Sequence, residues 1–195
     1  MKLRFGQIEE VLWIIHDVPK RDRTKFRGRL RNLKRAGLKL PSGDVGRRAN
    51  FDPADMFKLA FVMELVLRGG MPPEPAATSV SAHWPDVAEQ LFKARKAFKS
   101  GKPESRFLVA EPNAFNSKAY RFKPETGAHL GNRLAHPTQS FAVSTLLAVN
   151  IAAMLINVQR AAARVGIDMD ALEASLDHHQ EIVLNHGARV PLAGS

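Results

Sequence analysis

Residues 20–38 read KRDRTKFRGRLRNLKRAGL, and this stretch determines how the N-terminal part of the chain is expected to fold. Three apolar residues in it have the spacing that places them on one side of a helix: Phe26, Leu30 and Leu33. Gly37 follows at a position typical of a helix C-cap. We therefore predict a helix over about residues 22–36 that packs on a neighbouring helix through a narrow apolar stripe.

The remainder of this predicted helix is densely basic. Six arginines and three lysines lie in residues 20–35, and Asp22 is the only acid between Lys20 and Gly43. Such a face repels itself, and phosphate groups would relieve the repulsion while releasing counterions. Arginine can fork onto guanine or phosphate, so we predict binding of double-stranded DNA rather than a merely solvated helix. The predicted DNA contacts on this helix are Lys20, Arg21, Arg23, Thr24, Arg27, Arg31, Lys34 and Arg35.

The neighbouring segments have the order of a winged helix-turn-helix. Residues 5–16 carry apolar residues at helical spacing, and Asp17-Val18-Pro19 ends that helix. Residues 38–50 contain one proline and two glycines and are expected to form a small wing. Asp52-Pro53 is a typical start for a third helix, which should end at Gly69-Gly70. Helix, turn, basic helix, wing and helix follow one another in this order.

Two short motifs resemble the MerR family of bacterial transcription regulators. Residues 30–38 read LRNLKRAGL and resemble the Leu-Arg-aromatic-aromatic-x-x-x-Gly-Leu end of that family's recognition helix, with Asn32 and Leu33 in the places of the aromatic pair. Residues 46–52 read GRRANFD at the place of its wing. The resemblance covers about residues 5–84. It implies that Arg31 contacts DNA from the recognition helix, and that Arg47 or Arg48 contacts the backbone or minor groove from the wing.

The fold class expected for the whole chain is mainly α, with an N-terminal winged helix-turn-helix and a helical C-terminal domain that holds a short β-hairpin. Residues 99–103 read KSGKP and are the expected boundary, which gives domains 1–100 and 101–195. The further elements expected are helices over residues 75–82 and 86–99, a hairpin of residues 106–110 and 119–123, a loop over 124–137, and helices over 138–165 and 168–186.

The predicted helix over residues 138–165 carries apolar residues spaced by four and three positions, as in a coiled coil. This seam consists of Leu147, Ile151, Met154, Val158, Ala161 and Val165. Two interpretations are equally favoured: the seam is a homodimer interface, or it belongs to the core of the C-terminal domain.

The charge of the chain is concentrated at its N-terminal end. The 195 residues include 29 Lys and Arg against 19 Asp and Glu, which gives a net charge of +10. Residues 1–50 hold fourteen of the basic residues and only five acids, as expected for a protein with a polyanionic partner. No cysteine is present, so disulfides and thiolate chemistry are excluded, and we expect a cytoplasmic, nucleoid-associated protein.

Neither a membrane span nor an enzymatic site is expected. The longest apolar run, residues 141–156, is shorter than the ~20 residues that a spanning helix needs. His178, His179, Glu181 and His186 form the best histidine cluster, but they lack a His-Glu-x-x-His pattern. The chain has no phosphate-binding glycine loop and no nucleophile elbow. We therefore expect no catalytic residues, no metal and no cofactor.

The sequence-based hypothesis is a sequence-specific DNA-binding protein, a bacterial or phage-like transcription regulator that binds as a homodimer and places its basic helix in a major groove. Two alternatives remain open. The first is a mobile-element recognition factor, similar to an excisionase or a terminase small subunit and without a regulatory role of its own. The second is a membrane-associated protein that uses residues 141–156.

Overall fold

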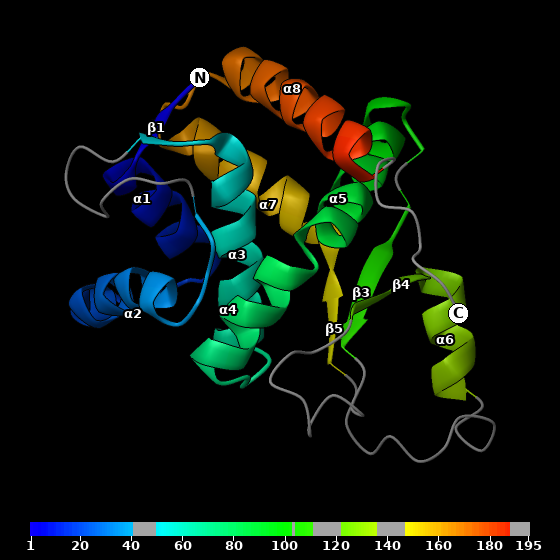
Figure 1. Cartoon of the computed structure of the whole chain (residues 1–195), viewed down its shortest axis with the longest axis horizontal. Helices are drawn as coiled ribbons and strands as arrows, with labels where there is room; N and C mark the ends of the chain where they lie inside the picture. The colour runs from blue at the N-terminus through cyan, green and yellow to red at the C-terminus, as the bar shows by residue number, and fades with distance from the viewer. Residues whose placement is uncertain (41–49, 103, 111–121, 136–146, 188–195) are drawn as a thin grey trace.

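The computed structural model describes residues 1–40, 50–102, 104–110, 122–135 and 147–187, and within them the protein is mainly helical (Figure 1). Eight α-helices, one 3-10 helix (η1) and five short strands make up these segments. The mainly α fold expected from the sequence, with a small antiparallel sheet, is confirmed. The predicted wing residues Arg47 and Arg48 lie outside the described residues.

The N-terminal elements are β1 (Leu3–Arg4), α1 (Phe5–Ile15), η1 (Lys20–Asp22) and α2 (Arg23–Arg35). Helix α1 buries Ile8, Val11 and Leu12, and α2 buries its predicted apolar stripe. The predicted basic helix therefore exists, but its first turn is a separate 3-10 turn. Strand β2 (Asn50–Phe51) follows and pairs antiparallel with β1, with Leu3 opposite Phe51.

Helix α3 (Pro53–Leu67) runs through the middle of the molecule (Figure 1). It starts where the sequence predicts, because the Asp52 carboxylate accepts a hydrogen bond from the Ala54 backbone N–H at 3.0 Å. Apolar residues on every side of α3 are buried, which makes it a core helix and not an amphipathic surface helix. Helix α4 (Pro73–Ala82) packs on α3, and α5 (Trp84–Lys99) packs on α4.

Three antiparallel strands form a sheet in the order β4-β3-β5. Strand β3 (Arg106–Ala110) was predicted with these bounds, whereas β4 (Phe122–Thr126) lies three residues later than expected. The loop predicted over 124–137 was wrong, since helix α6 (Gly127–Ala135) follows β4. The third strand, β5 (Leu147–Asn150), was predicted as helix. Its backbone pairs with β3 from Leu147 opposite Ala110 to Asn150 opposite Phe107.

The long helix predicted over 138–165 is shorter in the structure, where α7 spans Ile151–Arg164. The Asn150 side chain accepts a hydrogen bond from the Ala153 backbone N–H at 3.0 Å and so starts the helix. Helix α8 (Met169–Gly187) follows and lies against α5. Arg95, only 4% exposed, joins these two helices through ion pairs to Glu173 and Asp177, both at 2.5 Å.

One hydrophobic core connects the two halves of the chain, so the boundary predicted at residues 99–103 does not separate two cores. Helix α7 packs on α1, α3 and α5, and α8 packs on α3 and α5. Leu12 and Val62 from the first half belong to the same buried cluster as Ile151 and Leu172 from the second. Among the described helices, none has the length and apolar character that crossing a bilayer requires.

Candidate nucleic-acid interface

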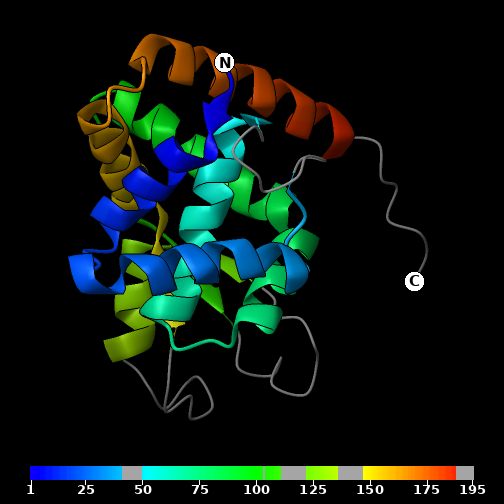
Figure 2. The same ribbon diagram turned by 90° about the vertical axis from the view of Figure 1, so that its left-hand side faces the viewer.

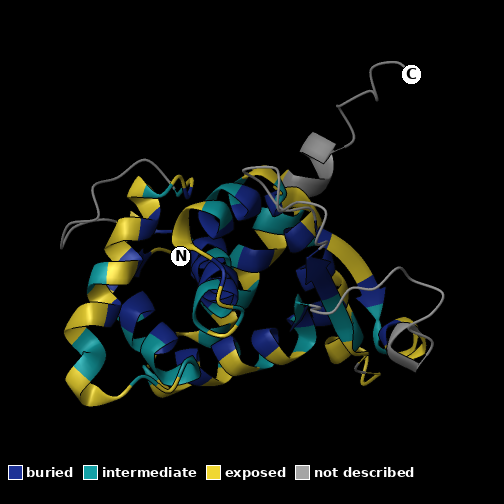
Figure 3. Ribbon diagram, turned by 90° about the horizontal axis from the view of Figure 1, so that it is seen from below, coloured by how far each residue is buried: buried dark blue, intermediate teal, exposed yellow. Residues whose placement is uncertain are grey.

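Helix α2 lies at the edge of the molecule, and one side of it is open to solvent. In Figure 2 it runs across the face turned toward the viewer, and in Figure 3 it is the helix at the left edge, with exposed residues along its outer side. Only Phe26, Leu30 and Leu33 are buried in it, at 1–3% exposure. The apolar stripe therefore packs α2 against the core, and the polar residues of α2 lie at the surface.

The side of α2 that faces α1 is neutralised by two glutamates. Arg27 donates a hydrogen bond from Nε to the Glu9 carboxylate at 2.7 Å, and Arg23 Nε lies 3.5 Å from the same carboxylate. Arg23 also pairs with Glu10 and stacks over the Trp13 ring, 4.7 Å from the ring centre. Glu9 is only 2% exposed, so its charge needs these partners.

These contacts change the assignment of two predicted DNA-contact residues. Both Arg23 and Arg27 hold α2 against α1 by ion pairs, and these pairs partly neutralise their charge. The hydrogen bond and ion pair with Glu9 raise the pKa of Arg27 above its ordinary value. We therefore treat them as residues that position the helix.

Other cations of this region remain available. Within the described part of the chain, no carboxylate lies within ion-pair distance of Lys20, Arg29, Arg31 or Arg35, all of which are exposed. The Arg31 guanidinium lies 5.8 Å from the centre of the Phe5 ring. Arg21 is 87% exposed and only loosely paired with Asp22, at 3.6 Å. Thr24 is exposed as well, and Lys34 is exposed but has an interaction partner of its own.

The helix backbone is accessible at one position on the outer face of α2, between the long cationic side chains. On a helix with 100° per residue, Thr24, Gly28 and Arg35 lie opposite the buried stripe. A Cβ atom at Gly28 would meet no other atom within 4 Å. A partner can therefore come close to the backbone of α2 at this point.

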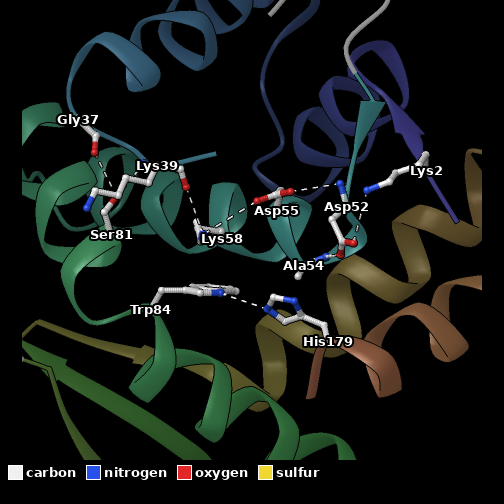
Figure 4. A network of polar contacts seen from close by, with 10 residues as sticks. All are labelled: Lys2, Gly37, Lys39, Asp52, Ala54, Asp55, Lys58, Ser81, Trp84 and His179. Carbon is white, nitrogen blue, oxygen red and sulfur yellow. Dashed lines mark hydrogen bonds and ion pairs between the residues drawn. The ribbon is translucent and has the colours of Figure 1, made fainter. Parts of the chain in front are cut away.

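Lys39 and Asp52, which lie on either side of residues 41–49, are fixed to α3 by a network of polar contacts (Figure 4). Lys58 donates from Nζ to the Lys39 carbonyl at 3.2 Å and lies 4.0 Å from the Asp55 carboxylate. Asp55 in turn accepts a hydrogen bond from the Asp52 backbone N–H at 3.1 Å. Lys39 and Asp52 are thus held by two side chains of one helix.

Burial perturbs both charged groups of this network. It raises the pKa of Asp55 to about 6, although the nearby Lys58 ammonium acts in the opposite direction. Burial lowers the pKa of Lys58, although Asp55 and Asp52 oppose this. The Lys58 ammonium also lies 4.7 Å from the centre of the Trp84 ring. The indole N–H of Trp84 donates to His179 Nε2 at 3.4 Å.

The sequence analysis missed this network, although one signal for it was present. Asp55 and Lys58 are the only charged residues in the apolar run from Pro53 to Met63, and they are three positions apart. Two isolated opposite charges at this spacing on a buried helix indicate a pair inside the protein. His179, from the predicted histidine cluster, contacts this network, and the described residues include no group of His, Asp and Glu side chains that could hold a metal ion.

The apolar seam that was predicted as a dimer interface is buried within the core of the same chain. Ile151, Met154, Val158 and Ala161 are between 0 and 5% exposed, packed on the core that α7 shares with α1, α3 and α5. Leu147 lies in β5 and not on the helix, and Val165 follows its last residue. The four buried side chains are not free to contact a second copy, so the core interpretation describes this seam and the dimer interface predicted there was wrong.

Comparison with protein-family models, with curated proteins and with solved structures finds no match to this chain. The assignment of a site therefore rests on the residues and their surroundings.

Proposed function

We propose that this protein binds double-stranded DNA by placing the outer face of α2 in a major groove. The observation that carries the proposal is the exposed row of cations on α2 without carboxylate partners among the described residues. A surface whose positive charge has no internal counterpart binds polyanions by releasing their counterions.

The shape of α2 supports the same partner. A helix with its side chains is about 10–12 Å across, and the major groove is about 12 Å wide. Gly28 and Thr24 leave room for the groove floor near the helix backbone, and Arg31 and Arg35, four residues apart, project from the same outer face. Arginine can form two parallel hydrogen bonds to a guanine edge or to a phosphate.

The contacts with α1 and α3 give the interface a fixed geometry. Glu9 and Glu10 hold α2 through Arg23 and Arg27, which makes the direction of the outer cations independent of DNA. Lys58 holds the Lys39 carbonyl and Asp55 holds the Asp52 backbone, and the segment between Lys39 and Asp52 contains Arg47 and Arg48. These two arginines are proposed to contact the backbone beside the groove.

The resemblance to MerR-type regulators supports a regulatory role for this DNA binding. The described elements follow the order β1, α1, α2, β2, α3, with the predicted wing between α2 and β2. We therefore extend the proposal to a transcription regulator that acts on DNA inside the cell.

The salt dependence of affinity tests the proposal. Fluorescence anisotropy of a labelled mixed-sequence duplex, measured between 50 and 300 mM KCl, gives the slope of log K against log salt. Four to six phosphate contacts predict a slope between about −3.5 and −5.5. Arg31→Gln and Arg35→Gln should each reduce that slope by about one.

A matched control separates α2 from the general positive charge of the chain. Arg164 is an exposed arginine at the end of α7, and Arg164→Gln should leave the slope unchanged. A slope near zero for the natural sequence contradicts DNA binding. Equal effects of Arg164→Gln and Arg35→Gln place the binding surface elsewhere.

A further inference from the structure

A cleft of about 400 Å³ lies between the turn after α1, the start of α2 and the end of α3. This volume is in the range of sites that hold small molecules, roughly 300–1,000 Å³. Its walls combine apolar side chains with charged ones. They come from parts of the chain up to 52 residues apart, from His16 to Arg68.

Most charges at this cleft are paired within the protein. Lys25 lies 3.3 Å from Asp22, and Arg68 lies 3.2 Å from Glu64. Arg68 also donates to the Ile15 carbonyl at 3.2 Å and so satisfies an acceptor at the end of α1. These groups have their partners and need no ligand.

Two oppositely charged side chains at the cleft have no ion-pair partner among the described residues. Arg29 and Asp17 both line it and are exposed, and neither has an ion-pair partner among the residues that the structure describes. Asp17 also has a φ of +47°, the only positive φ of a non-glycine residue in the described segments. Aspartate tolerates this left-handed conformation better than most residues, and it turns the chain at the mouth of the cleft.

The inner wall is apolar and contains one unsatisfied polar side chain. Phe26, Val18 and Leu67 line the cleft, and the His16 ring lies 6.3 Å from the Phe26 ring. The His16 side chain is 1% exposed, and neither ring nitrogen has a hydrogen-bond partner in the described part of the chain. The Nδ1 atom lies 3.8 Å from the Glu64 carboxylate, which is longer than a hydrogen bond.

We infer that this cleft binds a small zwitterion, an α-amino acid with an apolar side chain. The ligand carboxylate pairs with Arg29, its ammonium group pairs with Asp17, and its side chain lies on the wall formed by Phe26, Val18 and Leu67. A simple anion would be repelled by Asp17, and a simple amine would be repelled by Arg29. The inference concerns binding of the amino acid alone and does not depend on the proposed DNA binding.

Binding is tested first by calorimetric titration of the full-length protein with free L-leucine, L-isoleucine, L-valine, L-methionine and L-phenylalanine at up to 10 mM. For the tightest of these, N-acetylation removes the ammonium charge and amidation removes the carboxylate charge. Each modification should weaken binding roughly ten- to hundred-fold, as expected for the loss of one charged hydrogen-bonded pair.

Two variants connect this binding to the cleft. Arg29→Gln and Asp17→Asn each remove one charge, and asparagine keeps the tolerance for a positive φ. Each should weaken binding of the free amino acid roughly ten-fold or more. Their matched controls are Arg35→Gln on the outer face of α2 and Asp170→Asn at the start of α8, both exposed and away from the cleft. The controls should bind like the natural sequence.

Several results would overturn the inference. One is the absence of heat and of any thermal shift with all five amino acids. Another is equal binding of the amide or the N-acetyl derivative, which would show that only one charge is recognised. A third is undiminished binding by the Arg29→Gln and Asp17→Asn proteins when circular dichroism shows that both are folded.

Discussion

Arg27 and Arg35 are eight residues apart on α2 and have different surroundings. Arg27 is paired with the buried Glu9 carboxylate, whereas Arg35 is exposed without a described carboxylate partner. Arg27→Ala should lower the midpoint of thermal unfolding, because Glu9 loses its closest cation. Arg35→Ala should leave the midpoint unchanged and weaken DNA binding about ten-fold. Calorimetric melting and anisotropy titrations on both variants check this, and a reversed pattern would contradict the assigned roles.

His16 makes the stability of the protein depend on pH. Burial, with the nearby Arg68 guanidinium, lowers its pKa from 6.5 to about 4. The pKa in the folded state is below that in the unfolded state, so the unfolded chain binds the extra proton, and the contribution of His16 to stability falls as the pH falls through this window. Between pH 7 and pH 5 this contribution amounts to about 2 kcal/mol. Asp55, whose pKa is raised to about 6, acts in the opposite direction.

The variant His16→Phe removes the titrating group and keeps a ring beside Phe26. Urea unfolding at pH 7 and pH 5 should show a smaller loss of stability for His16→Phe than for the natural sequence. Equal losses would mean that His16 is not the group responsible. The comparison is made within each protein, so a change in overall stability caused by the substitution does not affect it.

At the scale of elements, α3 holds the end of the segment that follows α2 through Lys58. Lys58→Met removes the ammonium group that contacts the Lys39 carbonyl and Asp55. We expect a loss of about 2 kcal/mol in the free energy of unfolding, since a buried carboxylate loses its charged partner. The control Lys93→Met breaks an exposed pair with Glu89 and should cost less than about 0.5 kcal/mol. Similar losses in the two urea titrations would contradict a supporting role for Lys58.

The elements that local signals define were predicted well. Asp52-Pro53 marks the start of α3, and the apolar stripe of α2 was recognised because its spacing is that of a helix. The elements that depend on distant partners were not. Residues 147–150 read LAVN within a long apolar run, and only their pairing with β3 makes them a strand. Likewise, nothing near Arg23 and Arg27 in the sequence indicates that Glu9 and Glu10 neutralise them.

At the scale of the whole molecule, the shared core predicts that the two halves unfold together. Ile151 lies in the second half and is fully buried, and both tryptophans, Trp13 and Trp84, lie in the first. Ile151→Asp places a charge in this core and should lower stability by several kcal/mol. The midpoints from tryptophan fluorescence and from far-ultraviolet circular dichroism should fall by the same amount. A fluorescence midpoint that does not change would show two independent domains.

The packing of α7 on α1 and α3 also has a consequence for synthesis on the ribosome. The residues of α1 emerge first, but the helix that covers them follows more than 130 residues later. During most of translation Leu12 and Val62 therefore lack their final neighbours, and the nascent chain exposes apolar surface that chaperones recognise. Chains terminated before Ile151 are expected to be degraded rather than to persist as shortened DNA-binding proteins.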